Sequence, residues 1–144
     1  MWISARVEGM DYYSNKKNRV KGIIVAHGNL AEELISTTEL IVGKVSDFYA
    51  VSGSNMSSED VVKRIKEILS DGETEKAVIF VDYFGGSTYT NSIRAVRDMD
   101  NIYVISGVNL PIILDFVTKR EAFDFGEMLH HLIERGKESI RILK

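Results

Sequence analysis

Short runs of consecutive apolar residues alternate along the chain with longer segments in which apolar residues recur every three or four positions. Such runs are typical of strands buried on both faces of a parallel sheet, whereas the spaced segments are typical of amphipathic helices. The alternation predicts an α/β fold with a doubly wound, mostly parallel sheet. The expected strands cover Lys21–Ala26, Val45–Val51, Ala77–Val81 and Ile102–Ile105.

Helices are expected between these strands and after the last one. In the helix before the fourth strand, Ile93 and Val96 are expected to face the sheet, and Gly136 is expected to end the last helix. Ser139–Lys144 has the alternation of a short strand. The expected helices cover Asn29–Val42, the segment from Ser57 or Ser58 to Asp71-Gly72, the segment after Gly85-Gly86-Ser87, the segment that Pro111 opens, and Phe123–Arg135.

The length of 144 residues favours a single domain. Residues 1–20 are polar and lack a regular pattern, so we interpret them as an N-terminal extension and residues 21–144 as the domain. The first 20 residues lack the apolar core of a secretory signal, and no apolar run approaches the length of a membrane span. We therefore expect a cytoplasmic protein.

The composition argues against several classes of function. A net charge of −3 argues against binding the phosphate backbone of a nucleic acid as the main role. The sequence has no cysteine, which excludes disulfides, thiolate metal sites and a cysteine nucleophile. The glycine motifs of nucleotide-binding folds do not occur, so we expect no nucleotide cofactor.

A histidine and an aspartate follow directly on two of the expected strands. His27 comes after the first strand and Asp82 after the third. In the flavodoxin-like strand order 2-1-3-4 these strands are neighbours at the switch point, where open α/β sheets bind ligands. Asp82 can then accept the Nδ1–H of His27 and leave the lone pair of Nε2 facing outward. Because a histidine held in this way is a nucleophile, we expect His27 to accept a phosphoryl group.

Small residues surround this pair in the sequence. Gly28 follows His27, and Gly85, Gly86 and Ser87 come soon after Asp82. Small or absent side chains let backbone N–H groups approach an anion, and the helix that starts after the serine adds its dipole. The sequence therefore predicts a phosphate-sized pocket that uses neither lysine nor arginine and no metal.

Each of these residues also has a simpler interpretation. A single histidine at a strand end can be a polar turn residue, Gly-Gly-Ser can be an ordinary loop, and Asp82 can stabilise a turn. His130-His131 with Glu127 and Glu134 has a helical spacing that could bind a metal. Because consecutive histidines point in different directions on a helix, we favour a solvated helix face there.

Three segments resemble the signature motifs of a known family and occur in the same order. From about Lys21 to its last residue, the chain is similar to the mannose-type IIA components (EIIA) of the bacterial sugar phosphotransferase system. The segments are Ala26-His27-Gly28, Asp82-Tyr83-Phe84-Gly85-Gly86-Ser87 and Gly107-Val108-Asn109-Leu110-Pro111.

The resemblance implies a role for each of these residues. It implies that His27 takes a phosphoryl group from the phosphocarrier HPr and passes it to a IIB component, for uptake of a sugar of the mannose, fructose or sorbose class. Asp82 would orient His27, Ser87 would help bind the phosphate, and the membrane components IIC and IID would take part only indirectly. The resemblance implies no cofactor. It also implies a homodimer whose subunits exchange the C-terminal strand, here Ser139–Leu143.

Two features depart from the family pattern. Thr88-Tyr89-Thr90 follows Ser87, where the family usually has Pro-Phe-Asn, and the residues before the first strand have no usual counterpart. Two other functions stay open on the same fold. One is the related phosphotransfer subunit of a dihydroxyacetone kinase, against which the Gly-Gly-Ser turn argues. The other is a non-catalytic regulatory module in which His27 stays unphosphorylated.

Overall fold

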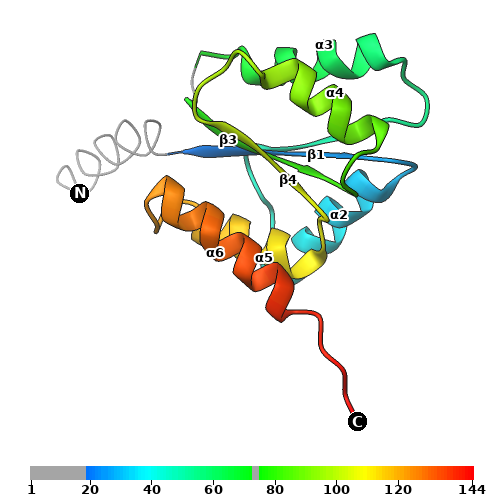
Figure 1. Cartoon of the computed structure of the whole chain (residues 1–144). Helices are drawn as coiled ribbons and strands as arrows, with labels where there is room; N and C mark the ends of the chain where they lie inside the picture. Colours follow the sequence, from blue (N-terminus) through cyan, green and yellow to red (C-terminus); the bar gives the residue numbers. More distant parts are fainter. Residues whose placement is uncertain (1–18, 73–74) are drawn as a thin grey trace, which may run out of the picture.

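The computed structural model describes residues 19–72 and 75–144 (Figure 1). Residues 1–18 of the predicted N-terminal extension lie outside the described residues, and the division of the chain at residue 20 stays a prediction. The described strands are parallel and form one sheet in the order β2-β1-β3-β4, which confirms the predicted fold class and strand order. They cover Val20–Ala26 (β1), Phe48–Ser52 (β2), Lys76–Val81 (β3) and Ile102–Ser106 (β4).

The two central strands, β1 and β3, end at the same level of the sheet. Val25 of β1 pairs with Val81 of β3, so the residues that come next leave the sheet side by side. All of β1 is buried, and β3 is buried from Ala77 onward. This burial explains the continuous apolar runs in the sequence, because a parallel strand covered on both faces has no solvent side.

Helices cover both faces of the sheet, with α3 and α4 on one face and α2, α5 and α6 on the other (Figure 1). Successive side chains of a strand point to opposite faces. Ile24 and Phe80 therefore pack in the layer of α5 and α6, whereas their neighbours Ile23 and Ile79 pack in the layer of α3 and α4. The helices cover Leu30–Val42 (α2), Ser58–Leu69 (α3), Ser87–Val96 (α4), Leu110–Lys119 (α5) and Phe125–Glu138 (α6).

The second strand begins at Phe48, later than the predicted Val45. Asp47 has a φ of +52°, which is incompatible with an extended strand, so the chain turns there before it enters the sheet. The guanidinium of Arg120 holds this turn because it donates to the backbone carbonyl oxygens of Ser46 at 2.6 Å and Asp47 at 3.3 Å.

Helix α4 faces the sheet through small residues. Ser92 and Ala95 are buried, and Val96 is buried as predicted. The prediction for Ile93 is wrong, because this residue is 39% exposed. The small side chains at positions 92 and 95 place the helix against the sheet, and this orientation turns Ile93 toward solvent.

The last helix includes Gly136, which the sequence analysis expects to end it. That expectation is wrong, since α6 continues to Glu138. A Cβ atom at Gly136 would lie only 2.5 Å from Cδ1 of Ile112 on α5. The glycine therefore allows α5 and α6 to pack closely, and its role is packing rather than termination.

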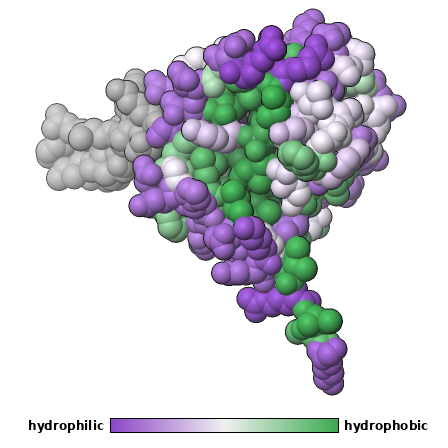
Figure 2. Space-filling view, viewed as in Figure 1, coloured by the Kyte–Doolittle hydropathy of each residue, from purple (hydrophilic) through white to green (hydrophobic). Residues whose placement is uncertain are grey.

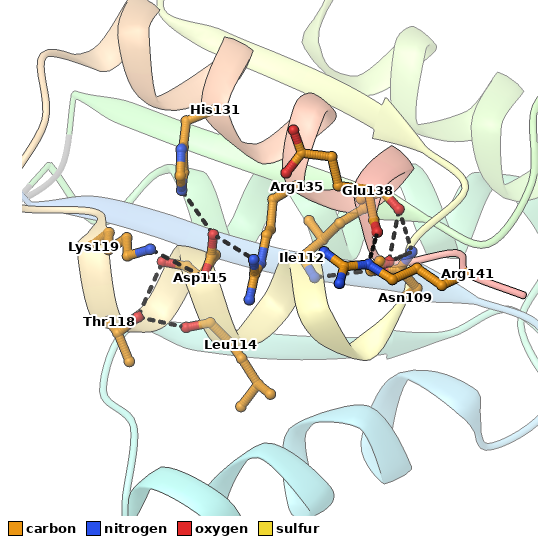
Figure 3. A network of polar contacts seen from close by, with 12 residues as sticks. Asn109, Ile112, Leu114, Asp115, Thr118, Lys119, His131, Arg135, Glu138 and Arg141 are labelled. Carbon is orange, nitrogen blue, oxygen red and sulfur yellow. Dashed lines mark hydrogen bonds and ion pairs between the residues drawn. The ribbon is translucent and has the colours of Figure 1, made fainter. Parts of the chain in front are cut away.

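A buried carboxylate on α5 holds α6 in place (Figure 3). The Oδ2 atom of Asp115 lies 2.7 Å from Nε2 of His131 and 3.7 Å from Nε of Arg135, both on α6. Lys119 of the same helix lies 3.3 Å from the other carboxylate oxygen. The adjacent His130 is exposed. The two histidines therefore point in different directions, and His131 serves the packing of α6 on α5 instead of a solvated face.

The chain leaves the domain after Ser139. Residues 140–144 form no strand within this chain, so the short strand expected over Ser139–Lys144 is not present in the structure of the single chain. Ile140, Ile142 and Leu143 are 79%, 92% and 87% exposed, and this tail projects away from the helices (Figure 1). Within the described residues, no helix is both long enough and apolar enough to cross a membrane.

Candidate functional site

His27 and Asp82 meet at the carboxyl end of the sheet. They follow β1 and β3, which end at the same level, so their side chains face each other. Nδ1 of His27 lies 2.7 Å from Oδ2 of Asp82, and the backbone N–H of His27 donates to the same oxygen at 2.9 Å. The structure thus brings together the two residues that the sequence analysis pairs.

The carboxylate of Asp82 accepts hydrogen bonds at both oxygens. Oδ1 accepts from the hydroxyl of Thr88 at 2.7 Å and from the backbone N–H of Tyr83 at 3.1 Å. Partial burial by itself raises the pKa of Asp82, but the hydrogen bonds from Thr88 and His27 and the charge of His27 outweigh it, so this pKa lies below its ordinary value. Asp82 is therefore an ionised acceptor at neutral pH. This assigns the ring hydrogen of His27 to Nδ1 and a lone pair to Nε2.

Nε2 is the ring nitrogen of His27 that does not bond to Asp82, and the His27 side chain is 47% exposed. The hydroxyl oxygen of Ser87 lies 3.3 Å from Nε2. The ring of Tyr83 stacks on the imidazole, with centroids 5.5 Å apart and an angle of 25° between the planes. An accessible ring nitrogen with a lone pair, next to a hydroxyl group, can attack a phosphoryl group. Ser87 was predicted from the sequence to belong to the site, whereas Tyr83 was not, although Tyr83 directly follows the aspartate.

Two helices begin at this site without a side-chain cap. α2 follows Asn29 and α4 follows Gly86, and neither N-cap residue has a side chain bonded to the first turn. By contrast, α3, α5 and α6 are capped by Ser57, Asn109 and Asp124. Because the first N–H groups of a helix have no partner within it, the starts of α2 and α4 offer donors and a positive dipole end to an anion.

The glycines that the sequence analysis selects differ in backbone geometry. Gly28 has a φ of +56° and Gly85 a φ of +84°, a region that favours glycine, and both lie in tight turns. Gly86 has an extended backbone, and a Cβ atom there would lie 2.5 Å from the ring of Tyr83. Glycine at position 86 therefore leaves room for the aromatic ring that stacks on His27.

Two serines, one at the end of β2 and one in the turn that follows it, hold the turn at Gly28, and neither was predicted to belong to the site. The N–H of Gly28 donates to the hydroxyl oxygen of Ser54, and the hydroxyl of Ser52 donates to the carbonyl oxygen of Gly28 at 2.6 Å. The Gly28 amide is therefore already paired, in contrast to the expectation that it faces a phosphate. The strand order 2-1-3-4 could have indicated that these serines lie near Gly28, because it places the end of β2 beside the end of β1.

The described residues contain no group of three or more His, Asp or Glu side chains placed to hold a metal ion. On α6, His131 bonds to Asp115 while His130 faces solvent, so the histidine pair does not converge on one point. Within the described part of the chain, the polar groups around Nε2 of His27 suit an anion better than a metal.

The sequence matches the family described as "PTS system fructose IIA component" over residues 21–133. It is 33% identical over 129 residues to the PTS system mannose-specific EIIAB component of Escherichia coli (strain K12), in an alignment that covers 85% of this chain and 39% of that protein. The chain thus spans about two-fifths of the length of that relative. It is 27% identical over 124 residues to the PTS system fructose-specific EIIA component of Bacillus subtilis (strain 168), with 83% and 84% of the two chains covered.

Solved structures share this fold. The phosphotransferase system component EIIA from Streptococcus agalactiae aligns with a TM-score of 0.80 at 27% identity, over 86% of this chain and 97% of that chain. The mannose/sorbose specific IIA subunit from Enterococcus faecalis aligns with a TM-score of 0.77 at 21% identity, over 88% and 96% of the two chains. Because the Enterococcus faecalis subunit is only 21% identical to this chain, its similarity shows a shared fold and nothing more.

Proposed function

The chain belongs to the EIIA family of the mannose, fructose and sorbose class of the phosphotransferase system, and on this basis we propose that it relays a phosphoryl group from phospho-HPr to a IIB component through His27. The observation that supports the proposal most directly is the 2.7 Å contact between Nδ1 of His27 and Asp82, which leaves the lone pair of Nε2 turned away from Asp82 on a half-exposed imidazole. The relay would operate in the cytoplasm during uptake of a sugar of this class, with the membrane components IIC and IID involved only indirectly.

In the first half of the relay, the lone pair of Nε2 on His27 attacks the phosphorus atom of the phosphoryl group on HPr. The bond from phosphorus to HPr breaks as the bond to Nε2 forms, and its electron pair returns to the HPr atom that held the group. The Nδ1–H stays on His27 and continues to donate to Asp82, whose negative charge offsets the positive charge that develops on the ring. In the second half, a nucleophile on IIB attacks the phosphoryl group of His27 in the same way.

The phosphoryl group on Nε2 would be held by the start of α4. Its oxygens would accept hydrogen bonds from the hydroxyl of Ser87 and from backbone N–H groups of the turn Gly85-Gly86 and the first turn of the helix. Gly28 would contribute through the shape of its turn, because its amide is paired with Ser54. These donors are neutral, and the proposal requires neither a metal nor a cofactor.

We also propose a homodimer in which Ser139–Leu143 pairs with the edge of β4 in a second copy. β4 is the last strand of the sheet, and apolar residues gather along it between α4 and α6 (Figure 2). Beside this edge lies a groove lined by Ile105, Ile112 and Ile133, with Ile140 at the point where the tail departs. An unpaired edge next to an apolar groove, together with an exposed apolar tail, favours strand exchange.

The test of the relay is incubation of the full chain with enzyme I, HPr and phosphoenolpyruvate, followed by intact mass measurement. We expect the mass of one phosphoryl group to be added and to be lost in acid, as a phosphoramidate is. His27→Ala should abolish the addition, whereas His130→Ala, which removes an exposed histidine outside the site, should not. A label that survives acid, or one that persists in His27→Ala, would contradict the proposal.

The same assay separates the two alternative functions. A regulatory module on this fold would leave His27 unphosphorylated in the presence of active HPr. A phosphotransfer subunit of a dihydroxyacetone kinase would accept the phosphoryl group but pass it to the kinase rather than to a IIB protein. Transfer from the labelled chain to IIB is therefore the second measurement.

A further inference from the structure

Thr88 is a buried residue that bonds to Asp82, the aspartate that contacts His27 in the proposed site. It is the second residue of α4, and the residue is only 2% exposed. Its hydroxyl donates to Oδ1 of Asp82 at 2.7 Å. The other carboxylate oxygen, Oδ2, accepts from His27. Thr88 and His27 therefore bond to different oxygens of the same carboxylate.

Two fixed oxygens define the orientation of a carboxylate better than one. With Oδ2 alone bonded, the carboxylate of Asp82 could rotate about its Cβ–Cγ bond, because terminal torsions of this type are broad. The backbone N–H of Tyr83 also donates to Oδ1, at a longer distance of 3.1 Å. Of the two hydrogen bonds that fix Oδ1, the one from the hydroxyl of Thr88 is therefore the shorter.

The threonine side chain is itself well placed to act as a fixed donor. A β-branched side chain has few χ1 rotamers. A Cβ atom added at Gly53 would lie 3.6 Å from the methyl group of Thr88, so this methyl group packs beside the turn after β2. An ionised carboxylate can only accept, so the hydroxyl hydrogen of Thr88 points at Asp82.

We infer that Thr88 is a positioning residue for phosphoryl transfer: its hydroxyl fixes the carboxylate of Asp82, and the carboxylate fixes the Nδ1–H form of His27. This inference rests on the proposed function in its claim about rate, but its claim about the histidine tautomer can be tested without phosphoryl transfer. Thr88 does not face the open side of the site, so it acts through Asp82 and not on the partner protein.

The experiment compares Thr88→Val, which keeps the shape and loses the hydroxyl, with Thr88→Ser, which keeps the hydroxyl. Thr118→Val makes the same chemical change on α5, where the hydroxyl bonds only within its own helix, and serves as the control. The first readout is the 15N spectrum of the His27 imidazole in the full chain. We expect the Nδ1–H form in the wild type, in Thr88→Ser and in Thr118→Val, and a mixture of tautomers in Thr88→Val.

The second readout is transfer from phospho-HPr. We expect Thr88→Val to lower kcat by about tenfold, the size expected for a hydrogen bond to a charged group, with little change in KM because the residue is buried. Thr88→Ser should restore most of the rate. If Thr88→Val does not fold, Thr88→Ala removes the same hydroxyl and serves in its place.

The outcomes separate this inference from the proposed function. A wild-type chain that accepts no phosphoryl group overturns the proposed function, and the tautomer comparison then decides the role of Thr88 by itself. Unchanged tautomer populations in Thr88→Val overturn the inference. So does an equal loss of rate in Thr88→Ser and Thr88→Val, because that result would indicate a packing role for the side chain.

Discussion

The hydroxyl oxygen of Ser87 lies 3.3 Å from Nε2 of His27, and Asp82 bonds to the other ring nitrogen at 2.7 Å. The two nitrogens of one imidazole thus face different partners. Asp82 is an ionised acceptor that fixes the tautomer, whereas Ser87 is a hydroxyl that can turn its hydrogen toward an incoming oxygen. This division matches the two requirements of phosphoryl transfer, which are an oriented nucleophile and a donor for the transferred group.

Ser87→Ala should lower the rate of phosphoryl transfer from phospho-HPr by roughly 10- to 100-fold, because one donor to the transferred group is lost. The fold should be unaffected, since the residue is exposed and starts a helix that has no side-chain cap. Rapid-quench kinetics measures the rate, and Ser58→Ala at the start of α3 is the control for a serine at a helix start. Transfer at the wild-type rate by Ser87→Ala would remove this residue from the proposed site.

Asp82→Asn should slow transfer by about two orders of magnitude or more, by analogy with the loss seen when the buried aspartate of a serine protease is neutralised. The amide keeps the size of the side chain but lacks the charge, and it can favour the other tautomer of His27. The fold should survive because Asp82 lies on a turn at the end of the sheet. Thermal unfolding run beside the kinetics checks this point. A folded variant with an unchanged rate would show that His27 does not depend on Asp82.

The lowered pKa of Asp82 predicts a pH dependence of stability. Because this pKa is lower in the folded chain than in the unfolded chain, the stabilisation is complete above the unfolded value of about 3.9 and is lost as the pH falls through the folded value. Urea denaturation of the wild type and of Asp82→Asn at a series of pH values measures the difference in unfolding free energy. We expect this difference to shrink as the pH falls below about 4. A difference that does not change with pH would contradict the hydrogen-bonded carboxylate.

The ends of the apolar runs were sufficient to place His27 and Asp82 at the carboxyl ends of two strands, and the flavodoxin-like strand order 2-1-3-4, once assumed, was sufficient to pair them. A parallel strand buried on both faces has a recognisable pattern, and polar residues directly after it must lie at the carboxyl edge of the sheet. The roles of Ser52 and Ser54 at Gly28 were not predicted. They depend on side-chain hydrogen bonds across two strand ends, which no local pattern specifies.

Thr88 shows a second limit of sequence reasoning. Its departure from the proline of the family pattern was visible, but a threonine at a helix start suggests only a local cap. The structure points its hydroxyl back to Asp82 instead, six residues earlier in the chain. Gly136 is similar, since glycine usually signals a helix end, and only the position of Ile112 on α5 shows that it serves packing.

Gly136→Ala should therefore destabilise the protein, by about 1–3 kcal/mol, because the added methyl group would overlap the side chain of Ile112. Gly126→Ala, in the same helix, is the matched control. A Cβ atom there has its nearest neighbour at 3.5 Å, so the higher helix propensity of alanine should stabilise the chain by up to about 1 kcal/mol. Thermal or urea unfolding of both variants measures the change in unfolding free energy, which should have opposite signs in the two. Equal effects of the two changes would show that α5 and α6 can separate to admit the methyl group.

The dimer prediction depends on the tail. In a terminal strand Ile140 and Ile142 would share one face, and they are 79% and 92% exposed in the single chain. Burying one isoleucine side chain against a second copy contributes about 2 kcal/mol, so a single charge at this face should weaken the dimer considerably. Sedimentation velocity at micromolar concentration should show a dimer for the full chain and a monomer after removal of residues 140–144.

Ile142→Asp tests the same contact without shortening the chain, and Ser36→Asp adds an equal charge on the exposed part of α2 as the control. We expect Ile142→Asp to shift the monomer–dimer equilibrium toward the monomer and Ser36→Asp to leave this equilibrium unchanged. Transfer to His27 within the monomeric variant should persist, because Asp82, Ser87 and Thr88 all come from the same chain as the histidine. A full chain that sediments as a monomer would exclude the exchanged strand. A dimer that survives loss of the tail would place the interface on another surface.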